Sequence, residues 1–365
     1  MTRTRASTVL IAIIAIAMTI IILFVPVSAD RAILTIQTHG NEINAIAFAP
    51  DGLILASSSI GNDVIKTWDL SNGSLTHSLP APGVISNLAY ISSNHLISWD
   101  PSWDNIVCSW DSAGHPLGLP RLSIEACSHF AYCVDKQIFA LGFADNNQDD
   151  SIVAVVNAID GTERFRFILS GSLLAPLTMT GDGRFLAAGT IQVASSNATS
   201  IESAVSVWDL ESGVQVSRLP VTGSPERLEF SPDGKHVAAW WMNENMTIEI
   251  WDVQTRQLVS NLHADVKASI SEVKFSPDGK LLAAGAGNRT SSMVPFIRSF
   301  DRIYGEVRLW DLNKGVNLKT ITLQCPVTRL SFSPDGHRLA AGCDSGTIKI
   351  WSMDAMNATV DKTQE

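Results

Sequence analysis

The sequence has few of the patterns on which enzymatic and metal sites depend. None of its five cysteines belongs to a C-x-x-C pair, which argues against a zinc site. The eight histidines are scattered through predicted strands and turns without metal-ligand spacing. Neither a Gly-x-Ser-x-Gly motif nor a glycine-rich phosphate loop followed by a helix occurs. We therefore expect no metal, no cofactor and no catalytic activity.

Basic residues are also in deficit. The chain carries 26 lysines and arginines against 36 aspartates and glutamates, for a formal net charge of −10. A nucleic-acid-binding domain normally shows the opposite balance, because it must neutralise phosphates. An acidic domain is likewise repelled by an anionic membrane surface. These absences favour a protein partner and exclude nucleic acid.

Charge is absent from the beginning of the chain except at Arg3 and Arg5. An uncharged apolar run extends from Val9 to Val25, and small residues follow up to Ala29. This pattern is typical of a signal peptide cleaved after Ala29 or of a retained membrane anchor, and a buried core helix is a third alternative. We therefore predict one hydrophobic helix in residues 1–29 and an extracytoplasmic chain, secreted or anchored, that contacts the membrane only through this segment.

A turn motif recurs along the remaining chain. Phe-Ser/Ala-Pro-Asp-Gly sequences begin at Phe48, Phe230, Phe275 and Phe332, with a weaker copy at Thr180–Gly183. Proline presets the φ angle of such a turn, aspartate caps it, and glycine accepts positive φ. Alternating apolar residues flank each copy, which predicts β-hairpins.

A second motif follows each hairpin. Its successive copies are about forty residues or somewhat more apart along the chain. It consists of a strand that ends in Trp-Asp, or in Trp-Ser in the last copy. Aligning Gly161 with Gly73 reveals a hidden copy in which Val156-Asn157 replace Trp-Asp. The other copies are Trp68-Asp69, Trp110-Asp111, Trp208-Asp209, Trp251-Asp252, Trp310-Asp311 and Trp351-Ser352. The sequence therefore contains seven repeats.

The combined motifs resemble the WD-repeat β-propeller family over roughly residues 31–354. The resemblance implies an all-β fold of seven blades, each with four antiparallel strands around a central channel. We assign the propeller to residues 30–354 and a polar tail to residues 355–365. The last repeat lacks a fourth strand, and the orphan strand Ala32–Gln37 is expected to supply it and close the ring.

The resemblance also implies that all loops between second and third strands lie on one face. Three of these loops are long: residues 143–151, 190–204 and 286–305. Long loops gathered on one face suggest a binding surface, although tolerated loop growth is an equal alternative. The candidate binding residues are Trp103, Trp241, Phe296, Arg298, Arg302 and Tyr304. For Trp241, packing between blades is the alternative.

Cys325 and Cys343 are candidates for a disulfide bond. Extending the register of the last hairpin places Cys325 and Cys343 at the same end of adjacent strands, so a disulfide is one alternative and free thiols are the other.

We predict an interaction scaffold that uses the face with the long loops. The rival function is a propeller enzyme or small-ligand sensor at the channel mouth. A third alternative is a structural module of a larger membrane assembly.

Overall fold

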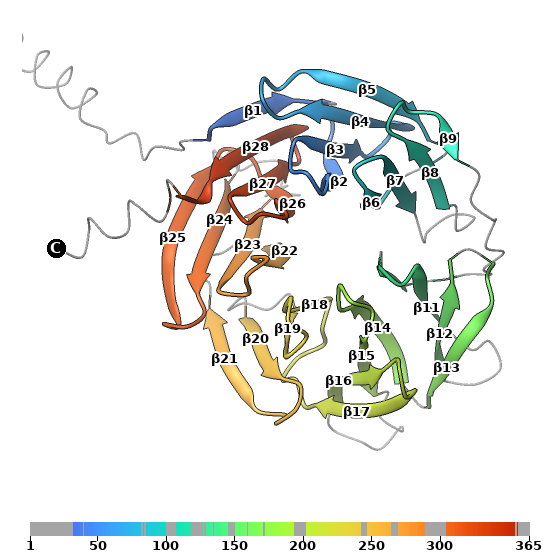
Figure 1. The fold of residues 1–365 in the computed structure, drawn as a ribbon. Helices are drawn as coiled ribbons and strands as arrows, with labels where there is room; N and C mark the ends of the chain where they lie inside the picture. Colours follow the sequence, from blue (N-terminus) through green and yellow to red (C-terminus); the bar gives the residue numbers. More distant parts are fainter. Residues whose placement is uncertain are drawn as a thin grey trace, which may run out of the picture. The chain divides into compact units, whose positions relative to one another are not determined.

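The computed structural model covers the propeller. All statements about the fold below refer to the residues that the model describes. The described residues are 32–38, 40–81, 83, 85–99, 107–117, 127, 129–133, 135–144, 150–158, 160–170, 172–192, 202–241, 247–263, 269–288, 304–354 and 356. They form an all-β ring of seven four-stranded antiparallel sheets (Figure 1). The predicted N-terminal helix lies outside the described residues.

Each of the first four blades runs in chain order from its inner to its outer strand. Blade one comprises β2 (Ile43–Phe48), β3 (Ile54–Ser59), β4 (Val64–Asp69) and β5 (Leu75–Pro80). Blade two comprises β6 (Asn87–Ser92), β7 (His95–Trp99), β8 (Val107–Asp111) and β9 (Pro116–Leu117). Blade three comprises β10 (His129–Cys133), β11 (Ile138–Ala144), β12 (Ser151–Asn157) and β13 (Glu163–Leu169). Blade four comprises β14 (Ser172–Met179), β15 (Phe185–Gln192), β16 (Glu202–Asp209) and β17 (Val214–Leu219).

The last three blades follow the same order, except that the outer strand of the seventh comes from the N-terminal end of the described chain. Blade five comprises β18 (Arg227–Phe230), β19 (His236–Trp240), β20 (Thr247–Asp252) and β21 (Leu258–His263). Blade six comprises β22 (Ser269–Phe275), β23 (Leu281–Asn288), β24 (Tyr304–Asp311) and β25 (Val316–Leu323). Blade seven comprises β26 (Val327–Phe332), β27 (Arg338–Cys343), β28 (Thr347–Ser352) and β1 (Leu34–Gln37).

The tryptophans of the Trp-Asp pairs are packing residues. Trp110 packs in one cluster with blade-one residues such as Ile65, and Trp310 packs with blade-five residues such as Ile248. The same relation to the preceding blade holds for Trp68, Trp208, Trp251 and Trp351. Each blade therefore buries its apolar face only against its neighbours, which ties the ring together.

The hidden repeat adopts the same geometry without the tryptophan. Val156 pairs with Phe139 on the second strand, as Trp68 pairs with Leu55 in blade one. A register shift follows at Val155/Val156, and equivalent shifts occur at Thr67/Trp68 and Val207/Trp208. The bulge therefore belongs to the repeat rather than to the indole ring.

The aspartates of these pairs close the turn between the third and fourth strands. Asp69 accepts hydrogen bonds at 2.8 Å from the Ser71 backbone N–H and at 2.6 Å from the Ser71 hydroxyl. These hydrogen bonds, the hydroxyl's first, lower the pKa of Asp69. The aspartate at this position thus caps a turn by satisfying backbone donors, and no ligand is needed to explain it.

The Ser-Pro-Asp-Gly turns share a second hydrogen-bonded motif. The hydroxyl of Ser333 donates to Asp335 at 2.5 Å and accepts the Arg338 N–H at 2.9 Å. Ser231, Ser276 and Thr180 do the same in their own turns. The first turn begins with Ala49 and lacks this hydroxyl.

Candidate functional site

The inner strands β2, β6, β10, β14, β18, β22 and β26 surround the central opening of the ring (Figure 1). Side chains from all seven of them line a cavity of about 340 Å³. This volume falls at the lower end of the roughly 300–1,000 Å³ typical of ligand sites. The cavity wall has two distinct parts, which we call the charged arc and the aromatic arc.

The charged arc comes from three consecutive blades. Its members stand at alternate positions of the inner strands and are Arg227 and Glu229 on β18, Glu272 and Lys274 on β22, and Arg329 on β26. Successive side chains on a strand point to opposite faces, so residues two apart point to the same side. This alternation brings five charged side chains to one stretch of the channel wall.

Four of these side chains are engaged with one another. Lys274 Nζ lies 2.9 Å from Glu229 Oε2 and 3.6 Å from Glu272 Oε1. Arg329 Nε lies 3.9 Å from Glu272 Oε2, and its guanidinium also donates to Asn44 Oδ1 at 3.2 Å. Glu272 therefore bridges two cations from neighbouring blades.

Burial and mutual attraction act together on these groups. Burial alone lowers the pKa of Lys274, but the Glu229 and Glu272 carboxylates outweigh it and raise that pKa. Burial lowers the pKa of Arg329, partly offset by Glu272. Lys274 therefore remains cationic at neutral pH, because its pKa is raised. Arg329 also remains cationic, because an arginine loses its proton only under strongly alkaline conditions.

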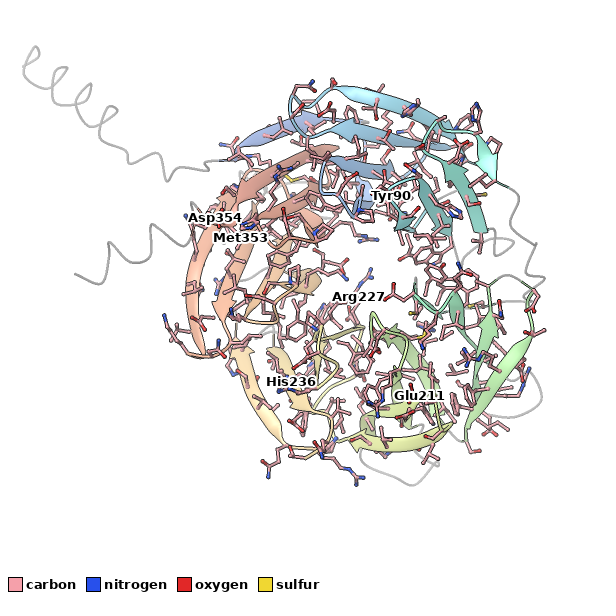
Figure 2. All side chains as sticks on the ribbon, in the orientation of Figure 1. Tyr90, Glu211, Arg227, His236, Met353 and Asp354 are labelled. Carbon is pink, nitrogen blue, oxygen red and sulfur yellow. A yellow bond between two sulfur atoms is a disulfide. The ribbon has the colours of Figure 1, made fainter. Side chains whose placement is uncertain are left out.

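Arg227 differs from the other members of the charged arc. Among the described residues, no carboxylate or carbonyl oxygen pairs with its guanidinium, and the residue is exposed. Its electrostatic neighbours are the cations Lys274 and Arg329, whose pKa values it lowers. Figure 2 shows Arg227 beside the central opening. The arc thus presents one uncompensated cation to the cavity.

The aromatic arc consists of Trp99 from blade two and Phe130 and Tyr132 from blade three. The Trp99 ring lies 4.9 Å from that of Phe130 and 6.0 Å from that of Tyr132, measured between centroids. Phe139 lies behind them, with its centroid 4.9 Å from Phe130 and 4.7 Å from Tyr132. These rings fill the junction at which Val156 replaces the usual tryptophan.

The long-loop face can be located from close backbone contacts. Gly305, the second residue of β24 after the long loop of blade six, lies so close to Cys325 that a Cβ there would overlap the Cys325 carbonyl. Gly287 is similarly close to Pro326, and both contacts are to the connection between blades six and seven. In blade six, therefore, the second-to-third loop and the blade connection share one face, which we call the loop face. Gly52, Gly279 and Gly336 each lie next to the turn of a neighbouring blade instead.

Most candidate binding residues cannot be placed. Trp103, Phe296, Arg298 and Arg302 lie outside the described residues, as does most of each long loop. Tyr304 is described at the start of β24, where its hydroxyl donates to the fully buried Glu306. Arg308 also binds Glu306, at 2.5 Å, so Tyr304 is part of a buried polar cluster.

Trp241 lies in the core, and its assignment as a binding residue is corrected accordingly. Its side chain is 8% exposed and packs with residues of blades four and five, and its ring covers Gly223. The adjacent Trp240 packs on the opposite side, against blade six. Adjacent strand residues point to opposite faces, so the pair fills two blade junctions.

Cys325 and Cys343 are joined by a disulfide in the structure, with their Cα atoms 5.8 Å apart. Val327 pairs with Cys343, so the bond links the connection between blades six and seven to the end of β27. Of the other cysteines, Cys127 and Cys133 are buried and Cys108 is half-buried. The redox state of the pair in solution remains a prediction.

The charged arc was not identified from the sequence. Its charges stand within the inner strands themselves, on β18, β22 and β26. The signal was present, because Arg227 and Glu229, like Glu272 and Lys274, are charged residues two apart in strands otherwise rich in apolar residues. These charged pairs meet in the channel because the blades that carry them are neighbours in the ring.

Comparison with known proteins agrees with this architecture. The family model for "WD domain, G-beta repeat" matches residues 31–69, 256–292 and 315–352. The chain is a WD-repeat β-propeller, with repeats found by the family model at three positions and seven blades in the ring.

The relatives it matches are similar over part of their length. The Periodic tryptophan protein 2 homolog of Neurospora crassa is 28% identical over 136 residues, which is 36% of this chain and 13% of the relative. The Small ribosomal subunit protein RACK1 of Caenorhabditis elegans is 26% identical over 130 residues, 35% of this chain and 34% of the relative. The U3 small nucleolar RNA-associated protein 21 of Saccharomyces cerevisiae is 27% identical over 81 residues, 22% of this chain and 8% of the relative.

The family match and these relatives agree with a non-enzymatic protein. They contradict the predicted extracytoplasmic location, because relatives named for the ribosomal subunit and for a nucleolar RNA are not secreted or anchored proteins. That prediction was wrong, and it had rested on residues 1–29 alone.

The part of the chain that the structure describes contains no helix with the length and apolarity to cross a membrane.

Proposed function

We propose that this propeller is a protein-interaction platform whose partner engages the loop face and the channel mouth. The observation that carries the proposal is the uneven channel wall, which combines an unpaired cation, a network of ion pairs and half-buried aromatic rings around one cavity. A wall that served packing alone would not leave the Arg227 guanidinium exposed beside the cavity and unpaired among the described residues. The acidic net charge supports a protein partner over a nucleic acid.

The long loops extend the proposed surface. Residues 143–151, 190–204 and 286–305 all connect second to third strands, as does the segment between β7 and β8 that contains Trp103. We therefore propose Trp103, Phe296, Arg298 and Arg302 as residues that contact the partner. Tyr304 is proposed only as an anchor for the base of the blade-six loop, because its hydroxyl is committed to Glu306. Loops mounted on a rigid scaffold are the usual position for binding residues.

A capture experiment followed by a titration tests the platform. Tagged full-length chain is used to isolate partners from its own cells, and the purified partner is then titrated against two variants. In the first variant a short Gly-Ser linker replaces residues 289–303. In the second, Lys280→Glu and Lys314→Glu reverse two exposed charges at turns on the face opposite the loop face.

We expect the linker variant to weaken binding at least tenfold, and the charge-reversal variant to bind as the wild type does. Loss of binding in the charge-reversal variant alone would place the partner on the other face. Unchanged binding in both variants would also contradict the proposal.

We further propose that β1 acts as the clasp of the ring. It pairs with β28 from Leu34↔Ile350 to Gln37↔Thr347, and the Thr38 N–H donates to the Gly346 carbonyl at 2.9 Å. Ile36 is buried in a cluster shared by blades seven and one. Closing the sheet in this way removes an exposed strand edge.

Shortening Ile36 should therefore open the clasp. Ile36→Ala is expected to lower the free energy of unfolding by about 2–4 kcal/mol, measured by urea denaturation. Leu75→Ala, at an exposed outer-strand site, is the control and should change it by less than about 0.5 kcal/mol. An equal, small effect of both variants would show that β1 does not hold the ring closed.

A further inference from the structure

We propose that the channel recognises a single carboxylate of the partner through the Arg227 guanidinium, with a neighbouring apolar residue of the partner placed against the aromatic arc. This inference deepens the proposed interaction function and depends on it. It names the chemistry that the cavity selects, which is an isolated acidic residue within an apolar segment.

Arg227 is the one member of the charged arc that is free to bind. Lys274 is occupied by Glu229 and Glu272, and Arg329 by Glu272, Asn44 Oδ1 and the Thr328 carbonyl. Arg227 forms no ion pair or hydrogen bond with another described residue, and it lowers the pKa of the cations Lys274 and Arg329, which shows that they repel it. An anion beside Arg227 would relieve that repulsion and gain charge-assisted hydrogen bonds, which a planar guanidinium offers in pairs.

The charge count of the arc selects a carboxylate over a phosphate. Three cations and two carboxylates leave one net positive charge. One carboxylate neutralises this charge, whereas a phosphate group carries about −1.5 to −2 at neutral pH. The excess negative charge of a phosphate would stand in the same cavity as Glu229 and Glu272. Like charges at such distances repel each other strongly in a partly buried site.

The overall charge of the chain narrows the ligand further. A net charge of −10 repels acidic tracts at long range, so an acidic partner gains nothing from electrostatic steering. Attraction begins only within the cavity, where Arg227 stands. A segment with one acid among apolar residues escapes most of the repulsion and still supplies the carboxylate.

The aromatic arc provides the second contact. Trp99, Phe130 and Tyr132 line the same cavity as Arg227, and they come from blades two and three. Aromatic side chains favour offset or edge contacts with other rings and bury large apolar areas. A phenyl group next to the carboxylate therefore suits the two parts of the wall at once.

A set of three dipeptide probes tests this inference by ¹⁹F NMR titration of the full-length chain. Each probe is an acetylated, amidated dipeptide that begins with 4-fluorophenylalanine and ends with aspartate, asparagine or phosphoserine. We expect the aspartate probe to bind at least tenfold more tightly than the asparagine probe, and more tightly than the phosphoserine probe. Equal affinity for aspartate and asparagine would overturn the inference, and tighter binding of phosphoserine would overturn the choice of carboxylate.

Variants then assign the contact. Arg227→Gln should reduce the affinity for the aspartate probe about tenfold and leave the asparagine probe unchanged. Arg218→Gln removes the same charge from an exposed position on the outer strand β17 and should change neither affinity. Circular dichroism and thermal unfolding confirm that each variant is folded. Unchanged aspartate binding in Arg227→Gln, or an equal loss in Arg218→Gln, would refute the role of Arg227.

The outcome can be separated from that of the proposed function. If the probes show no preference for aspartate while the wild-type chain binds its captured partner through the loop face, the carboxylate inference fails and the platform stands. If the probes show the preference but replacing residues 289–303 leaves partner binding unchanged, the platform proposal fails in its choice of face.

Discussion

The aromatic and charged arcs complete the same channel wall by different physical means. At the junction of blades two and three, Val156 stands where other blades have tryptophan, and Trp99, Phe130, Tyr132 and Phe139 fill the space from the inner side. Across blades five to seven the tryptophan anchors Trp251, Trp310 and Trp351 are present, and the inner positions are charged. Where the anchors already hold neighbouring blades together, the inner strands are free to carry charges.

The largest loss of stability is expected from a substitution in the aromatic arc. Phe139→Ala removes a nearly fully buried ring that supports both Phe130 and Tyr132, and leaves a cavity where no tryptophan anchor compensates. We expect a loss of about 3–5 kcal/mol in the free energy of unfolding, measured by urea denaturation. Phe139→Leu, which keeps most of the volume, is the matched control and should lose less than half as much.

The second-largest loss of stability is expected from a substitution in the charged arc. Glu272→Gln removes the carboxylate shared by Lys274 and Arg329 and leaves three cations opposed by Glu229 alone. We expect a loss of about 2 kcal/mol, smaller than for a fully buried pair because Lys274 and Arg329 are partly exposed. The double variant Glu272→Gln/Lys274→Met should recover part of this loss. A double variant less stable than Glu272→Gln would contradict the account of a cation left unpaired.

Alkaline pH distinguishes buried rings from solvated ones. Burial raises the pKa of Tyr132 to about 12, so the folded state keeps this proton at pH values where the unfolded chain, with a tyrosine pKa near 10, has lost it. The stabilising contribution is therefore complete below about pH 10 and is lost as the pH rises toward about 12. The three tyrosines of the chain all have raised pKa values.

Spectrophotometric titration at neutral to alkaline pH measures this shift directly. The folded chain should form almost no tyrosinate below pH 11, whereas the urea-unfolded chain should titrate near pH 10. Tyr132→Phe should remove about a third of the folded-state amplitude. A folded chain that titrates with the unfolded one would show that the aromatic arc is open to water.

The smallest effect is expected at Arg227. Its guanidinium has no attractive partner among the described residues, so Arg227→Gln should change the free energy of unfolding by less than about 0.5 kcal/mol. The change should be neutral or slightly stabilising, because repulsion from Lys274 and Arg329 disappears. A clear loss of stability in the same urea assay would mean that Arg227 has a structural role.

Buried acids show how a repeat can change its chemistry without changing its fold. In blade one the Trp68 indole donates to Ser57 on the neighbouring strand at 2.9 Å. In blade five the Trp251 indole donates at 2.9 Å to Glu249 on its own strand, and Glu249 also accepts the Thr222 hydroxyl at 2.6 Å. The repeat motif does not distinguish these two acceptors, and only the packed structure shows which one each indole reaches.

The sequence by itself determined the seven repeats, including the one marked by Val156, because turns and strand alternation are local properties that recur with every blade. It also identified the tryptophans and aspartates that recur in these repeats. Only the tertiary structure decided that Trp241 lies in the core and that charges from three blades meet in one arc. Contacts between separate blades depend on how the ring brings them together, and no spacing along the chain encodes that distance.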